Sequence, residues 1–210
     1  AIIDSDVLTV TGTTTVTTDV ADKAINLGSL ASPGNVIVSP VGTTGNVTIY
    51  SGTTALGVQG TVSGDLVLTS GEAITDSDIL TVTGTTKVTT DVADKAINLG
   101  SLASTGNVIV STLGTTGNVT IDNGTTALGV QGTIGGDLVL TSGQAITDSG
   151  TLTASGSTTI DSGSADITLD EVASTFGTLS LTGANVAVTD AGATDLGAST
   201  VSGTLGITSG

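Results

Sequence analysis

Residues 64–69 read GDLVLT, and this pattern decides the fold because it recurs along the chain. Two apolar residues, Leu66 and Leu68, flank a central Val67, and the other copies place Ile, Val, Ser or Gly at that centre. Alternation with period two is typical of a strand with one buried face, because successive side chains of a strand point to opposite sides. The other copies are GNVIVS (34–39 and 106–111), GDLVLT (136–141), GTLSLT (177–182) and GTLGIT (203–208). We therefore expect the flanking residues to point inward and the central residue to point outward.

A longer repeat contains these strands. Equivalent units begin at Ala1, Ala73 and Ala145. The first two units differ at 11 of 72 positions and therefore agree at 61, whereas the third is shorter and more divergent. Self-similarity at a fixed period is the signature of a repeat architecture. We expect one continuous solenoid over 1–210, built of units 1–72, 73–144 and 145–210.

The differences between the first two units are of two kinds. Val7 and Ile79 occupy equivalent positions and keep an apolar side chain of similar volume. Tyr50 and Asp122 are also equivalent, but they differ strongly in polarity. A packed interior and a permissive exterior would produce this division.

The turns and the strand count indicate the architecture. Gly, Asn, Asp and Ser separate the apolar runs and no helical periodicity is sustained, so the chain is predicted to be all-β. About nine short strands per unit, three to a coil, give coils of about 24 residues and a rod of nearly nine coils, roughly 40 Å long. We predict a right-handed parallel β-solenoid (β-helix) with triangular coils of about 20–27 residues. The alternative is a β-sandwich in every unit, but each unit has few large side chains for a two-sheet core.

The composition excludes several functions. The chain has no His and no Cys, so nucleophilic triads built on either residue are impossible. With three Lys, no Arg and a net charge of −16, it lacks the cations that bind nucleic-acid phosphates. No apolar run approaches the roughly 20 residues of a spanning helix, so we expect no membrane insertion.

Paired carboxylates are the remaining candidates for chemistry. Glycosidases use such pairs, but the chain has almost no aromatic residues to line a sugar groove, and we expect no enzyme activity. Asp-x-Asp turns offer oxygen ligands to calcium, although the calcium-binding nonapeptide repeat is missing. We predict that these residues hydrogen-bond the backbone of their own turns, with no metal and no cofactor. The pairs are Asp4 and Asp6, Asp76 and Asp78, and Asp170 and Glu171.

Other polar patterns have simpler interpretations. The threonines of residues 8–18 suit a face of an ice-binding solenoid only if they align in successive coils, and the third unit breaks the pattern. The sequons at Asn46, Asn118 and Asn123 are interpreted as residues at strand edges. Lys23 and Lys95 are expected to pair with nearby carboxylates in solvent.

The chain resembles the repeat region of filamentous-haemagglutinin-like bacterial exoproteins, the surface adhesins of two-partner secretion. The resemblance is carried by QAITDSGTLTASGSTTIDSGSADITLD (144–170), FGTLSLTGANVAVTDAG (176–192) and TDLGASTVSGTLGITSG (194–210). It implies a rod-like parallel β-helix outside the cell or on the bacterial cell surface. It transfers no functional residue, because the matched motifs are structural.

These observations lead to one functional prediction and two alternatives. We expect a non-catalytic structural segment of an extracellular bacterial surface filament or adhesin shaft. The final ITSG joined to the initial AIIDSD recreates LTSGEAITDSD with one residue missing, so the open ends are expected to contact flanking repeats or further copies of the chain. The alternatives are an adhesin module that binds host or matrix glycans or a receptor and, less favoured, an ice-binding solenoid.

Overall fold

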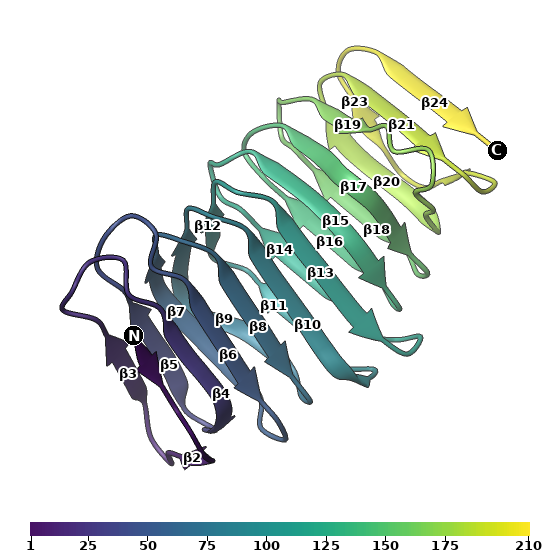
Figure 1. The fold of residues 1–210 in the computed structure, drawn as a ribbon. Coiled ribbons are helices and arrows are strands. Elements are labelled where there is room, and N and C mark those ends of the chain that lie inside the picture. The colour runs from purple at the N-terminus through teal and green to yellow at the C-terminus, as the bar shows by residue number, and fades with distance from the viewer.

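The computed structural model describes residues 1–210 and consists of strands and turns without a helix (Figure 1). Neighbouring strands are parallel throughout, and most strands pair with the strands of the preceding and following coils. The predicted all-β parallel solenoid is therefore confirmed, with about ten turns stacked from the N-terminal to the C-terminal end.

The strands form two sheets of twelve strands each, which we call the first and second sheets. The first sheet contains β1 (Ile2–Ile3), β2 (Leu8–Thr9), β4 (Ile25–Ala31), β6 (Val47–Ser51), β8 (Leu66–Ser70), β10 (Thr86–Ala93), β13 (Val108–Leu113), β15 (Leu128–Ile134), β17 (Ile146–Ala154), β19 (Ile167–Leu169), β21 (Val186–Asp190) and β24 (Leu205–Ser209). The second sheet contains β3 (Thr14–Thr17), β5 (Asn35–Ser39), β7 (Leu56–Val62), β9 (Ile74–Val82), β11 (Ile97–Leu99), β12 (Leu102–Ser104), β14 (Val119–Asp122), β16 (Leu138–Thr141), β18 (Thr158–Asp161), β20 (Thr178–Gly183), β22 (Asp195–Leu196) and β23 (Thr200–Val201).

The coils are shorter on average than the roughly 24 residues that the sequence predicted, although most of them lie within the predicted range of about 20–27 residues. In the first sheet, the longest step between paired residues runs from Ile2 to Ile25, and the shortest runs from Leu128 to Ile146. Even the longest step falls below the average length that was expected for a coil. With eleven strands along the main path of the first sheet and ten along that of the second, the rod contains ten and a half coils. At roughly 4.8 Å per coil it is about 50 Å long rather than 40 Å.

Most coils combine one straight strand with one bent strand. β9 is bent, because its first residues pair with β11 and its last residues pair with β12. Its register with β7 also shifts at the bend, between Val58 and Gly60 of β7. A coil with a bent strand therefore has the three strand segments expected of a triangular coil, but the two arms of the bent strand belong to one sheet.

Along one repeating unit the chain crosses between the two sheets an odd number of times. Val47 begins β6 in the first sheet, and its equivalent Val119 begins β14 in the second sheet. The chain crosses between the sheets seven times from β6 to β14, so a unit is three and a half coils long. The expectation of three whole coils was wrong, and equivalent residues of successive units lie on opposite faces of the rod.

The third unit keeps this arrangement with fewer residues. Val186 begins β21 and lies closer in sequence to Val119 than Val119 lies to Val47, yet the chain again crosses between the sheets seven times and returns to the first sheet. Part of the shortening lies in one connection between consecutive straight strands. Residues 114–118 connect β13 to β14 in the second unit, and only residues 184–185 connect the equivalent strands β20 and β21 in the third. The number of strands is therefore kept while the length of a connection changes.

The core is a single continuous cluster of 40 buried apolar residues. Leu66 and Leu68 are completely buried, and Val67 between them is partly exposed. The same alternation holds in the copies that begin at residues 34, 106, 136 and 177, which confirms the predicted inward and outward positions. The last copy differs because β24 has a neighbour on one side only, and Leu205 is 47% exposed.

Candidate functional site

The Asp-Ser corner holds the next coil in place. Both carboxylate oxygens of Asp76 accept hydrogen bonds, from the backbone N–H groups of Gly100 (2.9 Å) and Ser101 (2.7 Å). Asp4 makes the equivalent pair of hydrogen bonds one unit earlier, to the corner at Gly28 and Ser29. The recurring motif thus joins successive coils, whereas the sequence analysis expected hydrogen bonds within the turn itself.

Burial raises the pKa of the Asp76 carboxyl group. Desolvation raises the pKa of its carboxyl group above the ordinary value of 3.8, although the N–H donors of Ser101 and Gly100 act in the opposite direction. The negative charge of Asp122 raises the pKa further. Asp76 is therefore a partly buried acid beside a second acid, a combination that occurs at structural clamps as well as at functional sites.

Asp6 and Asp78, the second members of the first two predicted pairs, do not join Asp4 and Asp76 in a shared binding site. Asp6 and Asp78 accept hydrogen bonds from the N–H groups of the residues that follow them, Val7 (2.7 Å) and Ile79 (2.8 Å). No group of three or more His, Cys, Asp or Glu side chains is close enough to hold a metal ion. The four candidate aspartates are thus occupied by backbone N–H donors.

The pair in the third unit has a different environment. Asp170 and Glu171 are exposed, and their backbone N–H groups donate to the carboxylate of Asp148 (3.0 and 3.1 Å). Asp148 is the equivalent of Asp76 and is 9% exposed. The pair therefore marks the corner that Asp148 clamps.

A second kind of acidic clamp holds the loop between the straight strands β13 and β14 from the preceding coil. Asp94 accepts hydrogen bonds from the backbone N–H groups of Thr115 (2.9 Å) and Thr116 (3.0 Å), and these bonds hold the pKa of its carboxyl group below the ordinary 3.8. Asp22 makes the equivalent contacts in the first unit, with the same direction of shift. Both aspartates have a positive φ, which fixes the turn.

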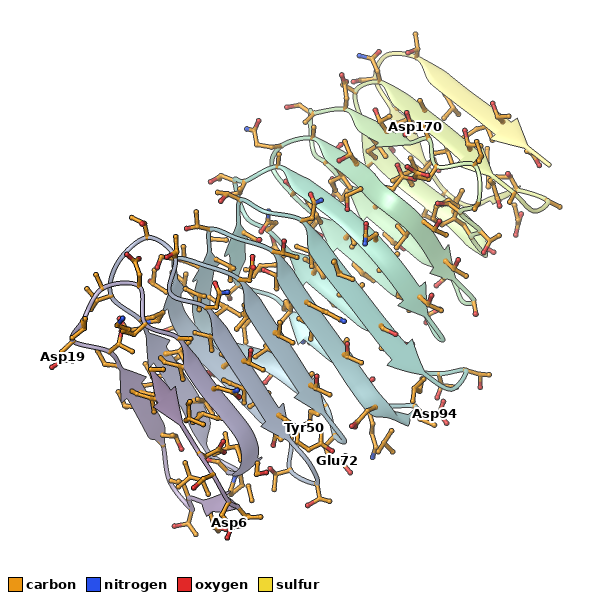
Figure 2. The ribbon with its side chains drawn as sticks, viewed as in Figure 1. Asp6, Asp19, Tyr50, Glu72, Asp94 and Asp170 are labelled. Carbon is orange, nitrogen blue, oxygen red and sulfur yellow. The ribbon has the colours of Figure 1, made fainter.

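The lysines were predicted to pair with nearby carboxylates. Lys95 confirms this through an ion pair of 2.7 Å with Glu72, in the preceding coil, whereas Lys23 forms no ion pair. Figure 2 shows Asp6, Glu72 and Asp94 along one edge of the rod, where the first-sheet strands end, and Asp19 along the opposite edge. Both edges thus carry negative charge.

The main concave feature is a depression that occurs twice, one unit apart. The larger copy has a volume of about 310 Å³ and is lined by Ile79, the corner 100–103 and the turn 122–126. The smaller copy has a volume of about 210 Å³, and its lining residues are equivalents of these, namely Val7, 29–31, Tyr50, Gly52 and Thr53. Because a unit spans three and a half coils, the two depressions open on opposite faces of the rod.

The depression arises where a run of bent strands ends. β9 is bent and β11 and β12 together form the next bent passage, but the following coil has the straight strand β14 and then the turn 123–127. The corner at 100–103 therefore projects beyond the coil that follows it. At the equivalent step of the third unit, the N–H group of Ala191 donates to the carbonyl oxygen of Ser174 (2.8 Å), and no depression is found.

The two depressions differ in their chemistry. The smaller one contains Tyr50, which is 40% exposed, and Val7, which is exposed although the sequence analysis assigned the apolar pair Val7 and Ile79 to the interior. The larger one contains Asp122 in place of Tyr50 and exposed Ile79 in place of Val7. Each offers an apolar residue beside hydroxyl and backbone groups, and only the smaller one offers an aromatic ring.

Asn123 is a structural residue that the sequence analysis missed. It is 1% exposed, its Oδ1 accepts from the N–H group of Ser104 (2.7 Å), and its Nδ2 donates to the carbonyl oxygens of Ser104, Thr126 and Ala127 (2.9–3.0 Å). The sequon was interpreted only as a strand edge. The signal that could have revealed it is the replacement of Ser51 by Asn at this position of the repeat.

A family of proteins described as Repeats of unknown function (DUF5649) matches residues 44–112, 116–182 and 183–210, which together cover most of the chain. The chain belongs to this family. The three matches begin at positions 44, 116 and 183, each the same short distance before the equivalent residues Val47, Val119 and Val186. The family repeat therefore coincides with the unit of three and a half coils.

No curated protein and no solved structure matches the chain. The structure also contains no helix long and apolar enough to cross a membrane.

Proposed function

We propose that the chain is a non-catalytic structural segment of an extracellular bacterial surface filament or adhesin shaft. The observation that carries this proposal is the continuous apolar core, which runs along the rod from Val16 to Val188 while the repeat adds the same series of coils. In a solenoid each repeat contacts only its neighbours, so length is increased simply by adding units. The bacterial surface location is supported by the sequence resemblance alone.

The aspartate side chains that hydrogen-bond the backbone of the following coil support the proposed role as a shaft. Asp4, Asp76 and Asp148 each bind the corner of the following coil through two backbone N–H groups. Asp22 and Asp94 each fix the loop of the next coil in the same way. Hydrogen bonds between coils resist bending and separation along the rod axis, which is the mechanical requirement of a spacer.

A deletion tests whether the unit is a module of length. Removing residues 73–144 joins equivalent positions of the repeat, so we expect a folded rod that is shorter by three and a half coils, roughly 17 Å. Small-angle scattering and far-UV circular dichroism would measure length and strand content. The matched control removes residues 73–108, which joins non-equivalent positions and is expected to lose folded structure at the junction. A folded 73–144 deletion of unchanged length would contradict the proposal.

Location is tested separately. Antibodies raised against the purified chain should label intact cells of the source organism, and protease treatment of those cells should remove the label. Label that appears only after the cells are broken would contradict a surface role.

A second candidate function is carbohydrate binding, which is favoured by the smaller depression. Sugar sites commonly pair an aromatic ring with hydrogen-bonding groups, and Tyr50 lines this depression together with Ser29 and Thr53. A glycan array with the full chain and with Tyr50→Asp tests this. The variant introduces the residue of the second unit, so it should fold normally, and loss of a specific signal would support binding at this depression.

The ice-binding alternative receives no support from the side-chain ladders. Thr15 points outward, but the residues stacked on it in the next two coils are Ile37 and Gln59. A flat threonine array would need threonine at one position in successive coils, and this column does not have it.

A further inference from the structure

One buried serine of the repeat has different hydrogen bonds in the first two units. In the second unit, the N–H group of Ser104 donates to Oδ1 of Asn123 (2.7 Å), and Nδ2 of Asn123 donates to the carbonyl oxygen of Ser104 (2.9 Å). One carboxamide group thus pairs with both backbone groups of the serine. The equivalents in the first unit are Ser32 and Ser51, so the carboxamide is replaced by a hydroxyl group.

The backbone of Ser32 has no hydrogen bond in the first unit. Ser32 is completely buried and only its hydroxyl group is hydrogen-bonded, whereas its N–H group and its carbonyl oxygen have no partner. In the third unit, the N–H group of the equivalent Ser174 donates to the carbonyl oxygen of Glu171 (3.0 Å), and its carbonyl oxygen accepts from Ala191 (2.8 Å). Buried backbone groups without a partner are rare, because each costs the free energy of a lost hydrogen bond. Of the three units, only the first leaves this donor and acceptor unpaired.

The unpaired groups lie next to the smaller depression. Ser32 directly follows Ala31, which lines that depression together with Tyr50, near the end of β6 (Figure 2). In the second unit, Asn123 lines the larger depression and reaches Ser104 from there. An amide that enters the smaller depression in the same way would reach the donor and the acceptor of Ser32.

The turn 52–55 controls access to Ser32. β6 pairs with β4 as far as Ser51 and Leu30, so the residues after Ser51 run beside Ser32. Because Ser32 is completely buried, this turn has to move before a ligand reaches it. In the second unit, Asn123 ties the equivalent turn to the preceding coil, since its Nδ2 also donates to two carbonyl oxygens of that turn. The turn 52–55 has hydrogen bonds to Ser51 and to the following coil only, so it can open without breaking a bond to the coil of Ser32.

We propose that the smaller depression is a binding site for a primary carboxamide group, such as the side chain of Asn or Gln. The carboxamide oxygen accepts from the N–H group of Ser32 and the carboxamide nitrogen donates to its carbonyl oxygen, as Asn123 does at Ser104. The rest of the ligand packs against the exposed side chains of Tyr50 and Val7. The inference goes beyond the role as a rod segment, and it gives the depression a different ligand from the glycan candidate.

The shape of the amide decides which ligands fit. Two hydrogen bonds to one serine use the same edge of the carboxamide, on which an N–H lies beside the oxygen. A primary carboxamide has this edge, because its nitrogen carries two hydrogens. In the secondary amide of a peptide bond or of an N-acetyl sugar, the N–H points away from the oxygen because the amide is trans. The site should therefore distinguish a carboxamide side chain from the backbone of the same peptide.

Acetamide is the probe that tests this geometry. Its titration into isotope-labelled protein should shift the NMR signal of the Ser32 amide, and N-methylacetamide, which can make only one of the two bonds, should bind about three- to tenfold more weakly. A Gly-Gln-Gly peptide and free glutamine then show whether the carboxamide is supplied by a polypeptide or by a free amino acid. Equal binding of acetamide and N-methylacetamide would overturn the proposal. A shift at Ser32 with methyl glucoside and none with acetamide would also overturn it and would favour the glycan candidate.

The variant Ser51→Asn fills the site with an amide of the chain itself. Residues 52–60 are identical to residues 124–132, so the variant should adopt the arrangement of Asn123 and keep its fold. We expect slower hydrogen exchange at the amide of Ser32 and loss of the shift with acetamide. The matched control is Thr48→Asn, which adds the same group to β6 outside the depression and should bind acetamide as the native chain does. Circular dichroism confirms that both variants are folded.

Two results with these proteins would decide against the proposal. Unchanged acetamide binding by Ser51→Asn would overturn it, because the site would then not involve Ser32. A native chain in which the amide of Ser32 exchanges as slowly as that of Ser104 would also overturn it, because the turn 52–55 would not open. Either result would leave the role as a rod segment intact, since the deletion of residues 73–144 tests that separately.

Discussion

Replacing Asn123 by Ala should strongly destabilise the middle of the rod. In this coil β12 pairs with the preceding coil only, and the Asn123 side chain supplies the missing link to Ser104. Of its partners, Ser104 is completely buried, while Ala127 is exposed and can bind water instead. The main loss is therefore that of the two buried backbone groups of Ser104. At roughly 1–2 kcal/mol for each, the unfolding free energy should fall by about 2–4 kcal/mol.

Urea unfolding followed by far-UV circular dichroism measures the global change. Hydrogen exchange measures the local one, because the amide of Ser104 should exchange much faster in the variant. Asn98→Ala is the matched control, since Asn98 is exposed on the neighbouring strand β11 and should change stability by less than about 0.5 kcal/mol. A loss at Asn123 no larger than the loss at Asn98, with Ser104 still protected, would refute the bridging role.

Three further perturbations test other parts of the structure. Leu138→Asp buries an unpaired carboxylate and should cost several kcal/mol in urea unfolding, whereas Val139→Asp on the outward side should be tolerated; equal losses would contradict the alternation. The pKa of Asp94 is lowered in the folded state, so its stabilisation is present above about pH 4 and is lost as the pH falls through the folded pKa. Asp94→Asn should accordingly lower the melting temperature at pH 7 and lose that deficit under more acidic conditions, and a deficit independent of pH would argue against the charge. Gly132→Ala should cost about 2 kcal/mol or more, because φ is +142° and the new Cβ would overlap a carbonyl oxygen of the preceding coil, while Gly12→Ala, in open space, should be nearly neutral in thermal melts.

The sequence was sufficient for the strands, their inward faces and the parallel solenoid. Alternation with period two is a local property, so GDLVLT assigns Leu138 and Leu140 to the core wherever the strand lies. The near identity of the first two units also indicated that equivalent segments would form equivalent elements. The same local logic located the corners at the Asp-Ser motif, although it did not show what Asp76 binds.

Only the tertiary structure decided which coil each residue contacts. The number of residues in a coil depends on corners, register shifts and bent strands such as β9. Because the coils are shorter than expected, one repeating unit fills three and a half coils instead of three, and the next unit starts on the opposite sheet. The partners of Asp76 are 24 and 25 residues away, and those of Asn123 include a residue 19 positions away. Such distances are set by the closure of each coil on the one before it, which no local pattern specifies. A repeat of the sequence thus determined what the elements are, while the packing of the coils determined on which face each one lies.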